Sequence, residues 1–236
     1  MSLIDDLRSD VKNTVTSIWS TRDGRVVPEL DSLGLDNDRV ELDAVFLYAD
    51  LADSTELAIG TQQIASEVCK AYIAGATKLI KDNGGEVRSF DGDRVMGVFI
   101  EGSMNTDAVR CGVQITTFFH QILVPEFRNF YTTSLNGYNL TQTVGIDVSE
   151  VYVCRAGPRI DNDLIWIGRA PNIAAKLSGV RNGYSVLVTD AVYKSLLPEV
   201  LNDINTGQNV WSSLNVPQVA GYGLGYVCGT NAHWVF

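Results

Sequence analysis

The stretch "DAVFLYADLADST", residues 43 to 55, constrains the fold and the chemistry of this chain more than any other. An apolar run with the character of a strand leads directly into Asp50, and Asp53 follows three positions later. A carboxylate at the end of a buried strand is costly unless a cation or hydrogen-bond donors neutralise it. Either the two acids are ordinary turn and helix-capping residues, or one of them binds a cation.

Composition and charge exclude several classes of function. The 236 residues include 18 basic and 28 acidic side chains, a formal net charge of -10, which disfavours nucleic acid and anionic membrane as partners. The four cysteines form no CxxC pair and there are two histidines, which argues against a zinc site or a disulfide framework. No apolar run approaches the roughly 18 residues of a membrane helix, and the acidic start is unlike a signal peptide. We therefore expect a soluble, cytoplasmic protein.

The order of the predicted elements indicates one α+β domain. Residues 1–39 are expected to hold an amphipathic helix, at 3–19, and an irregular connection, and residues 40–236 to form the domain. Its expected elements are a strand at 43–49, a helix ending near 82, strands at 86–90 and 94–100, a helix at 104–123, strands at 141–149, 151–157 and 164–168, a helix at 171–177, and a strand at 185–189. This order predicts a ferredoxin-like split βαβ sheet with helices on one face. From about residue 207, glycines and aromatic residues predict a late β meander or hairpin.

In such a sheet the acids Asp50 and Asp93 can meet. Asp50 ends the first strand, and Asp93 lies in the turn between the next two strands, which can lie beside the first. Two carboxylates at one sheet edge repel each other unless a cation neutralises them, and oxygen ligands favour Mg²⁺ or Mn²⁺ over zinc. As an alternative, Asp-Gly-Asp is common in turns and Asp53 is an ordinary N-cap. On the residues alone, Asp53 is better explained as a cap, and Asp50 stays undecided.

Three sequence blocks resemble the catalytic domain of class III nucleotide cyclases. They are "FLYADLADST", "GGEVRSFDGDRVMGVF" and "LIWIGRAPNIAAKL", and they occur in the family's order and approximate spacing within roughly residues 40–195. The resemblance implies the split βαβ core and a homodimer with its active sites at the subunit interface. The N-terminal helix and the C-terminal β extension would then flank the catalytic core.

By this resemblance Asp50, Asp93 and the carbonyl of Leu51 would hold two divalent ions, Mn²⁺ or Mg²⁺. In two-metal chemistry, one ion lowers the pKa of the ribose 3′-hydroxyl, which attacks the α-phosphate, and the other stabilises the triphosphate and the leaving pyrophosphate. Arg94 would bind the triphosphate or a base carbonyl, or else pair with a surface acid. The start of the helix after "LADST" would bind phosphate oxygens with its amides; the residues concerned are Ala52, Asp53, Ser54 and Thr55.

The same resemblance assigns Asn172 and Lys176 to the active site of the opposite subunit. They are four residues apart on one face of the expected helix. Asn172 would orient the ribose, and Lys176 would stabilise charge on the α-phosphate. The family usually has arginine at the position of Lys176, and lysine supplies a cation without the planar bidentate fork. The alternative for Lys176 is an exposed helix lysine without a role.

The expected base pocket has neither of the residue pairs by which members of the family recognise adenine or guanine. Adenine-specific members have lysine, and guanine-specific members glutamate, where this chain has Ser89; the second base-reading position is occupied by Ile165. The bulky Tyr48, Phe90 and Trp166 would narrow the pocket for a smaller base. The alternative for these aromatic residues is packing in the sheet core, which we favour for Phe90.

These features look most like the pyrimidine cyclases of bacterial Pycsar antiphage defence, and most of all like the uridylate cyclases. This resemblance implies conversion of UTP into cyclic UMP on phage infection, with a separate effector that reads the product. A serine hydroxyl can satisfy uracil or cytosine, so a cytidylate cyclase acting on CTP remains the first alternative. The next alternatives are an atypical adenylate or guanylate cyclase and then a non-catalytic nucleotide-binding regulatory domain.

Two features stay open from the sequence. Many family members bind the triphosphate with a lysine near the C-terminus, but this chain has no lysine after residue 207. Arg155, Arg159 and Arg169 are the candidates to replace it. The N-terminal helix is expected to act as a dimer brace or as a switch.

Overall fold

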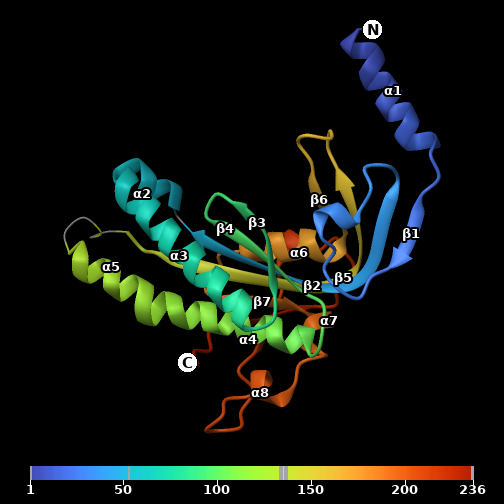
Figure 1. Ribbon diagram of the computed structural model, residues 1–236. Helices are drawn as coiled ribbons and strands as arrows, with labels where there is room; N and C mark the ends of the chain where they lie inside the picture. Colours follow the sequence, from blue (N-terminus) through green and yellow to red (C-terminus); the bar gives the residue numbers. More distant parts are fainter. Residues whose placement is uncertain (1, 53, 133–134, 136–137, 235–236) are drawn as a thin grey trace.

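A computed structural model describes residues 2–52, 54–132, 135 and 138–234. In this part of the chain a nine-stranded sheet has the strand order β3-β4-β2-β5-β7-β9-β8, with β1 paired to β2 and β6 paired to β5 (Figure 1). The strands are β1 Ser20–Asp23, β2 Asp38–Ala52, β3 Glu86–Asp91, β4 Arg94–Phe99, β5 Thr141–Ala156, β6 Asp163–Gly168, β7 Val186–Thr189, β8 Ser212–Leu214 and β9 Val227–Thr230. The helices are α1 Leu3–Thr16, α2 Ser54–Gly60, α3 Gln62–Asp82, α4 Met104–Phe118, α5 Val124–Phe130, α6 Arg169–Ser178, α7 Asp190–Tyr193 and α8 Pro198–Leu201.

The centre of the sheet is a split βαβ unit, as predicted. Strands β3, β4, β2 and β5 lie side by side, and β2 pairs antiparallel with both β4 and β5. The pairing of β2 with β5 is long, running from Arg39 opposite Cys154 to Ala52 opposite Thr141. β7 adds to β5 in parallel, and β9 and β8 then pair antiparallel, which confirms the predicted C-terminal hairpin.

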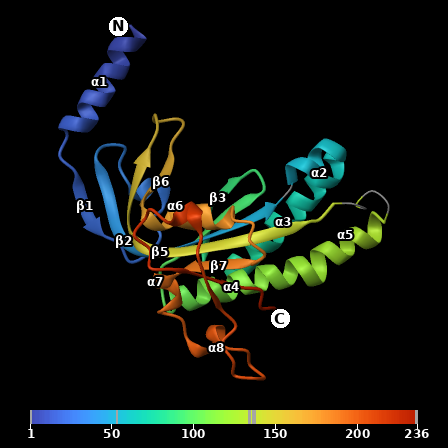
Figure 2. The same cartoon turned by 180° about the vertical axis from the view of Figure 1, so that it is seen from behind.

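Helices cover both faces of the sheet, so the prediction of helices on one face was wrong. Val45 and Leu47 of β2 point into a core shared with α3 and α4, whereas Phe46 points to the other face and packs in a cluster with Ala170 and Ala174 of α6. Figures 1 and 2 show α6 on the side of the sheet away from α3 and α4. A central strand that is apolar on both faces needs a cover on both.

The structure also differs from the prediction in where several elements end. The two strands expected at 141–149 and 151–157 are one continuous strand, β5. The helix expected to end near 123 continues through a π-helical turn, Phe119–Leu123, into α5. The connection expected to be irregular contains β1, and its Val27 and Leu33 are buried against the sheet.

The predicted N-terminal helix is present as α1 and projects from the body of the molecule (Figure 1). It has no buried residue. Its apolar stripe, Leu3, Leu7, Val11 and Val15, is exposed by 56% to 78%. No helix among the described residues is both long and apolar enough to cross a membrane.

Gly145 of β5 sets how closely α6 approaches the sheet. A Cβ atom at this position would lie 2.2 Å from the carbonyl oxygen of Ala174 and 2.4 Å from the amide nitrogen of Ser178. Both obstacles are backbone atoms of α6, so a rotamer change cannot relieve the clash.

We therefore expect Gly145→Ala to lower the free energy of unfolding by about 1–3 kcal/mol, as overpacking does. The measurement is urea unfolding. Gly221→Ala is the matched control, because a Cβ atom there meets no heavy atom within 4 Å. Equal unfolding midpoints for both variants would contradict the close packing of α6 on β5.

Candidate active site

The hairpin of β3 and β4 brings Asp93 beside Asp50. Asp50 of β2 is paired in register with Arg94, the first residue of β4, and Asp93 is in the turn just before it. Gly92 in this turn has a φ of 63°, which favours glycine. The pKa of the Asp50 carboxyl is raised, first by burial and also by the charge of Asp93. The structure thus brings together the two acids that the sequence singled out.

Two arginines offset the charge of Asp50, which is only 9% exposed. Nη2 of Arg181 donates a hydrogen bond of 2.9 Å to Oδ2 of Asp50. Nε of Arg94 lies 3.6 Å from Oδ1. Both guanidinium groups favour the ionised carboxylate and oppose the effect of burial on its pKa. Arg181 was missed from the sequence because no motif marks it.

The start of α2 is tied to the same turn. The hydroxyl of Ser54 donates a hydrogen bond to Oδ2 of Asp93. The side chain of Leu51 is in the core, so a ligand could meet this residue only through its backbone. Ala52 is buried and Thr55 is exposed. Asp53, expected to be a helix cap near the phosphates, lies outside the described residues.

The chemistry of these donors fits a hard divalent cation. Two carboxylates and a backbone carbonyl offer only oxygen atoms, which Mg²⁺ and Mn²⁺ prefer. Asp50 is nearly buried and two guanidinium groups lie against its carboxylate, so positive charge already surrounds this acid. In the part of the chain that is described, no group of three or more His, Cys, Asp and Glu side chains could hold a metal on its own. Any ion bound here would therefore need oxygen ligands from the backbone, water or the nucleotide.

The expected base-pocket residues Tyr48 and Ser89 lie in one row across the sheet. Met96 of β4 is paired in register with Tyr48 on one side and with Ser89 on the other. Paired residues share a face, and so do residues two apart in a strand, so this row lies on the same face as Asp50. The ring of Tyr48 is 6.0 Å from the Arg94 guanidinium carbon. Met96, which the sequence did not single out, forms the middle of the row.

The other aromatic and apolar candidates lie elsewhere. Trp166 of β6 packs edge-on against Phe46, with ring centroids 5.4 Å apart, so it takes part in a core cluster. Its neighbour Ile165 is 42% exposed. Phe90 is 58% exposed, so the expectation that it packs in the core was wrong. Phe90 is on β3, the edge strand, where a side chain can remain in solvent.

Asn172 and Lys176 are exposed on α6, one helical turn apart. Nδ2 of Asn172 donates to the carbonyl of Gly168 at 3.0 Å, and Nζ of Lys176 lies 5.5 Å from the ring centroid of Tyr222. Within the described residues, neither side chain has a hydrogen bond or ion pair with Asp50 or Asp93.

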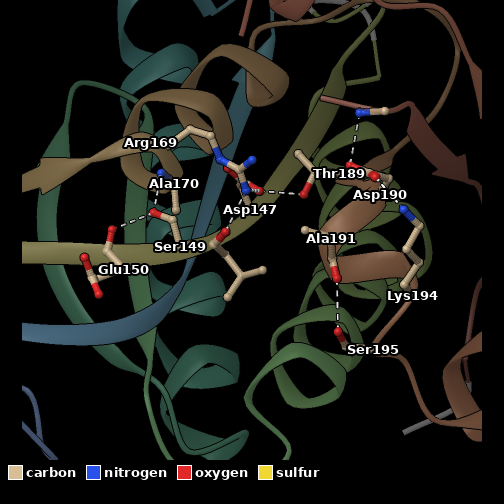
Figure 3. A network of polar contacts seen from close by, with 12 residues as sticks. Asp147, Ser149, Glu150, Arg169, Ala170, Thr189, Asp190, Ala191, Lys194 and Ser195 are labelled. Atoms are coloured by element: carbon tan, nitrogen blue, oxygen red, sulfur yellow. Dashed lines mark hydrogen bonds and ion pairs between the residues drawn. The ribbon is translucent and has the colours of Figure 1, made fainter. Parts of the chain in front are cut away.

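A buried polar network fixes the first turn of α6 (Figure 3). Asp147 of β5 is fully buried, and burial raises its pKa. Its Oδ1 accepts hydrogen bonds from the Thr189 hydroxyl at 2.5 Å and from Nη2 of Arg169 at 3.2 Å. The same Nη2 also donates to the carbonyl of Val148 at 2.8 Å. The network joins β5, β7 and α6, and thereby positions the helix that carries Asn172.

This network bears on the choice of a triphosphate-binding arginine. Arg169 is occupied by Asp147, and Arg155 is occupied by Asn162 at 2.6 Å and by Asp31 at 3.5 Å. Arg159 is exposed in the segment between β5 and β6. Of the basic residues considered so far, Arg181 and Arg94 are the ones that contact a candidate metal ligand.

Sequence comparison identifies relatives that are named uridylate cyclases. No protein-family model matches the chain. The uridylate cyclase of Rhodovulum sp. (strain MB263) is 40% identical over 196 residues, which cover 82% of this chain and 82% of that protein. The uridylate cyclase of Xanthomonas perforans is 36% identical over 216 residues, or 91% of each chain.

Solved structures with the same fold include nucleotide cyclases. A bacterial light-regulated adenylyl cyclase superposes with a TM-score of 0.66 at 21% identity, over 86% of this chain and 56% of that longer one. The adenylyl cyclase CyaB from P. aeruginosa gives a TM-score of 0.64 at 20% identity, over 81% of this chain and 95% of that one. These matches confirm the predicted fold, that of a class III cyclase catalytic domain.

Proposed function

Because the chain belongs to the uridylate cyclase family, it is a nucleotide cyclase, and we propose that it converts UTP into 3′,5′-cyclic UMP and pyrophosphate. The observation that carries this proposal is the 40% identity to a uridylate cyclase over 82% of both chains. The row of Tyr48, Met96 and Ser89 beside Asp50 supports it, because two bulky side chains favour a small base.

The residues of the site take the following roles in the proposed reaction. Asp50, Asp93 and the Leu51 carbonyl would hold two divalent ions, Mn²⁺ or Mg²⁺, which acidify the ribose 3′-hydroxyl and stabilise the developing phosphate charge. Ser54 holds the Asp93 carboxylate in place through its hydrogen bond. Arg94 attracts the polyphosphate. Ser89 exchanges a hydrogen bond with the base edge.

Asn172 and Lys176 complete the proposed site from a second copy of the chain. Asn172 orients the ribose, and Lys176 stabilises negative charge at the α-phosphate. Their exposure on α6, without a hydrogen bond or ion pair to Asp50 or Asp93 among the described residues, supports this division between subunits. The active enzyme is then a homodimer with two sites at its interface.

We further propose that the protein acts in the bacterial cytoplasm as part of antiphage defence. Cyclic UMP would be a second messenger, made on infection and read by a separate effector. The proposal rests on the resemblance to the Pycsar cyclases.

The test is incubation of the purified protein with Mn²⁺ and each of the four ribonucleoside triphosphates, followed by mass spectrometry of the products. We expect cyclic UMP to exceed every other cyclic nucleotide by at least about tenfold. Cyclic CMP as the main product would make the protein a cytidylate cyclase, and cyclic AMP or GMP would overturn the pyrimidine assignment. Nucleotide binding without any cyclic product would indicate a non-catalytic domain.

A further inference from the structure

Arg181 occupies a defined position between α6 and the candidate metal site. It follows the end of α6 by three residues, and its Nη1 donates to the carbonyl oxygen of Ser178 at 2.6 Å. Its Nη2 donates to Oδ2 of Asp50 at 2.9 Å. One end of the guanidinium is thus anchored to backbone, and the other is directed at a carboxylate. The neighbouring Val180 is buried, which fixes the segment that carries the arginine.

The guanidinium is neither fully buried nor free in solvent. The side chain of Arg181 is 37% exposed, whereas that of Asp50 is 12% exposed. Arg94 approaches the same carboxylate from β4, and its buried Nε has no hydrogen-bond partner among the described residues. Two guanidinium groups therefore flank one carboxylate, and that of Arg94 has a buried donor without a partner among the described residues.

With two divalent ions bound, the charges at the site would favour the binding of an anion. Two divalent ions offset the roughly four negative charges of a nucleoside triphosphate, which leaves Asp50 and Asp93 to be balanced by the protein. Arg94 and Arg181 supply that balance. When Asp50 ligates a cation, its carboxylate oxygens are no longer free to occupy both guanidinium groups. A planar guanidinium then finds its best partner in phosphate oxygens, which it binds through two parallel hydrogen bonds.

We propose that Arg181 is the residue that binds the polyphosphate of the nucleotide in its own subunit, and that it pairs with Asp50 before the nucleotide arrives. The proposal rests on the proposed function, because it assigns a residue to the nucleotide site. It accounts for the absence of a lysine after residue 207. Arg155 and Arg169 are engaged with side chains that are not candidate metal ligands, so a bound metal would not release them for the phosphates.

The experiment compares Arg181→Gln and Arg181→Lys with the full-length wild type. Arg128→Gln is the matched control, because it removes the same charge from an exposed position on α5. The readouts are the KM and kcat for UTP with Mn²⁺, and the calorimetric affinity for inorganic tripolyphosphate with Mn²⁺. Thermal unfolding and the binding of Mn²⁺ alone report on the fold and on the acids.

For Arg181→Gln we expect the KM for UTP and the Kd for tripolyphosphate to rise at least tenfold, with a smaller change in kcat. The KM and Kd of Arg181→Lys should lie between those of Arg181→Gln and the wild type, because lysine keeps the positive charge but lacks the planar bidentate guanidinium. Arg128→Gln should match the wild type. Removing the competing guanidinium should leave the affinity for Mn²⁺ alone unchanged or higher.

Other results of the same measurements would contradict the proposal or the proposed function. If both affinities stay within twofold of the wild type while the melting temperature falls, Arg181 is only a structural partner of Asp50, and the proposal is overturned. If Arg181→Gln does not fold, an Arg181→Lys variant that matches the wild type in KM and Kd would overturn it equally. If the wild type forms no cyclic product but tripolyphosphate binding still depends on Arg181, the proposed function fails and the assignment of Arg181 stands.

Discussion

Asp50→Asn and Asp93→Asn are expected to reduce cyclic UMP formation by roughly a thousandfold or more, because each would remove a proposed carboxylate ligand of the catalytic metal ions. Asparagine keeps the size of the side chain, so both variants should fold. The measurement is the initial rate with UTP and Mn²⁺, together with the Mn²⁺ affinity of the variant and its circular dichroism spectrum.

The same hairpin provides a control. Asp91 is two residues from Asp93, its side chain is 83% exposed, and its carboxylate is 4.0 Å from Arg94. Asp91→Asn removes an identical charge from the surface of the turn and should leave the rate within about twofold of the wild type. A rate for Asp93→Asn within tenfold of the wild type would remove Asp93 from the metal site.

Mixing two inactive variants should restore activity if each site is built from two subunits. We expect Asp50→Asn and the double variant Asn172→Ala/Lys176→Ala to be nearly inactive when assayed alone. In their heterodimer, one site receives both defects and the other receives none. The purified heterodimer should therefore show about half of the wild-type rate per dimer. The measurement is the cyclic UMP rate after co-expression with two different affinity tags and purification through both.

A mixture of Asp50→Asn with Asp93→Asn is the matched control. Both changes damage the same half of the site, so every site in that mixture keeps at least one defect and no activity should return. If a heterodimer of the first pair is isolated and shows no more activity than this control, Asn172 and Lys176 do not serve the opposite subunit.

Much of the site could be predicted because its parts are local in the sequence. The turn at Asp91-Gly92-Asp93 predicts a hairpin, and a hairpin beside β2 brings Asp93 to Asp50. The alternation of β2 places Tyr48 on the same face as Asp50. These relationships follow from the period of a strand and the chemistry of a turn.

The features of the site and fold that the sequence did not predict depend on contacts between distant segments of the chain. Arg181 is 131 residues from Asp50, and no local pattern indicates that the end of α6 reaches β2. The sequence predicted two strands, at 141–149 and 151–157, but the pairing with β2 continues through Glu150. The exposure of Phe90 follows from its place on an edge strand, which is a property of the whole sheet.

Helix α6 spans only ten residues, from Arg169 to Ser178, and polar groups hold it at both ends. In the proposed dimer its first turn serves one catalytic centre, through Asn172, and the segment that follows it serves the other, through Arg181. A tilt of α6 would then shift a ribose contact in one catalytic centre and a phosphate contact in the other. A molecule that binds to α6 and moves it would therefore change the rate at both catalytic centres of the dimer together.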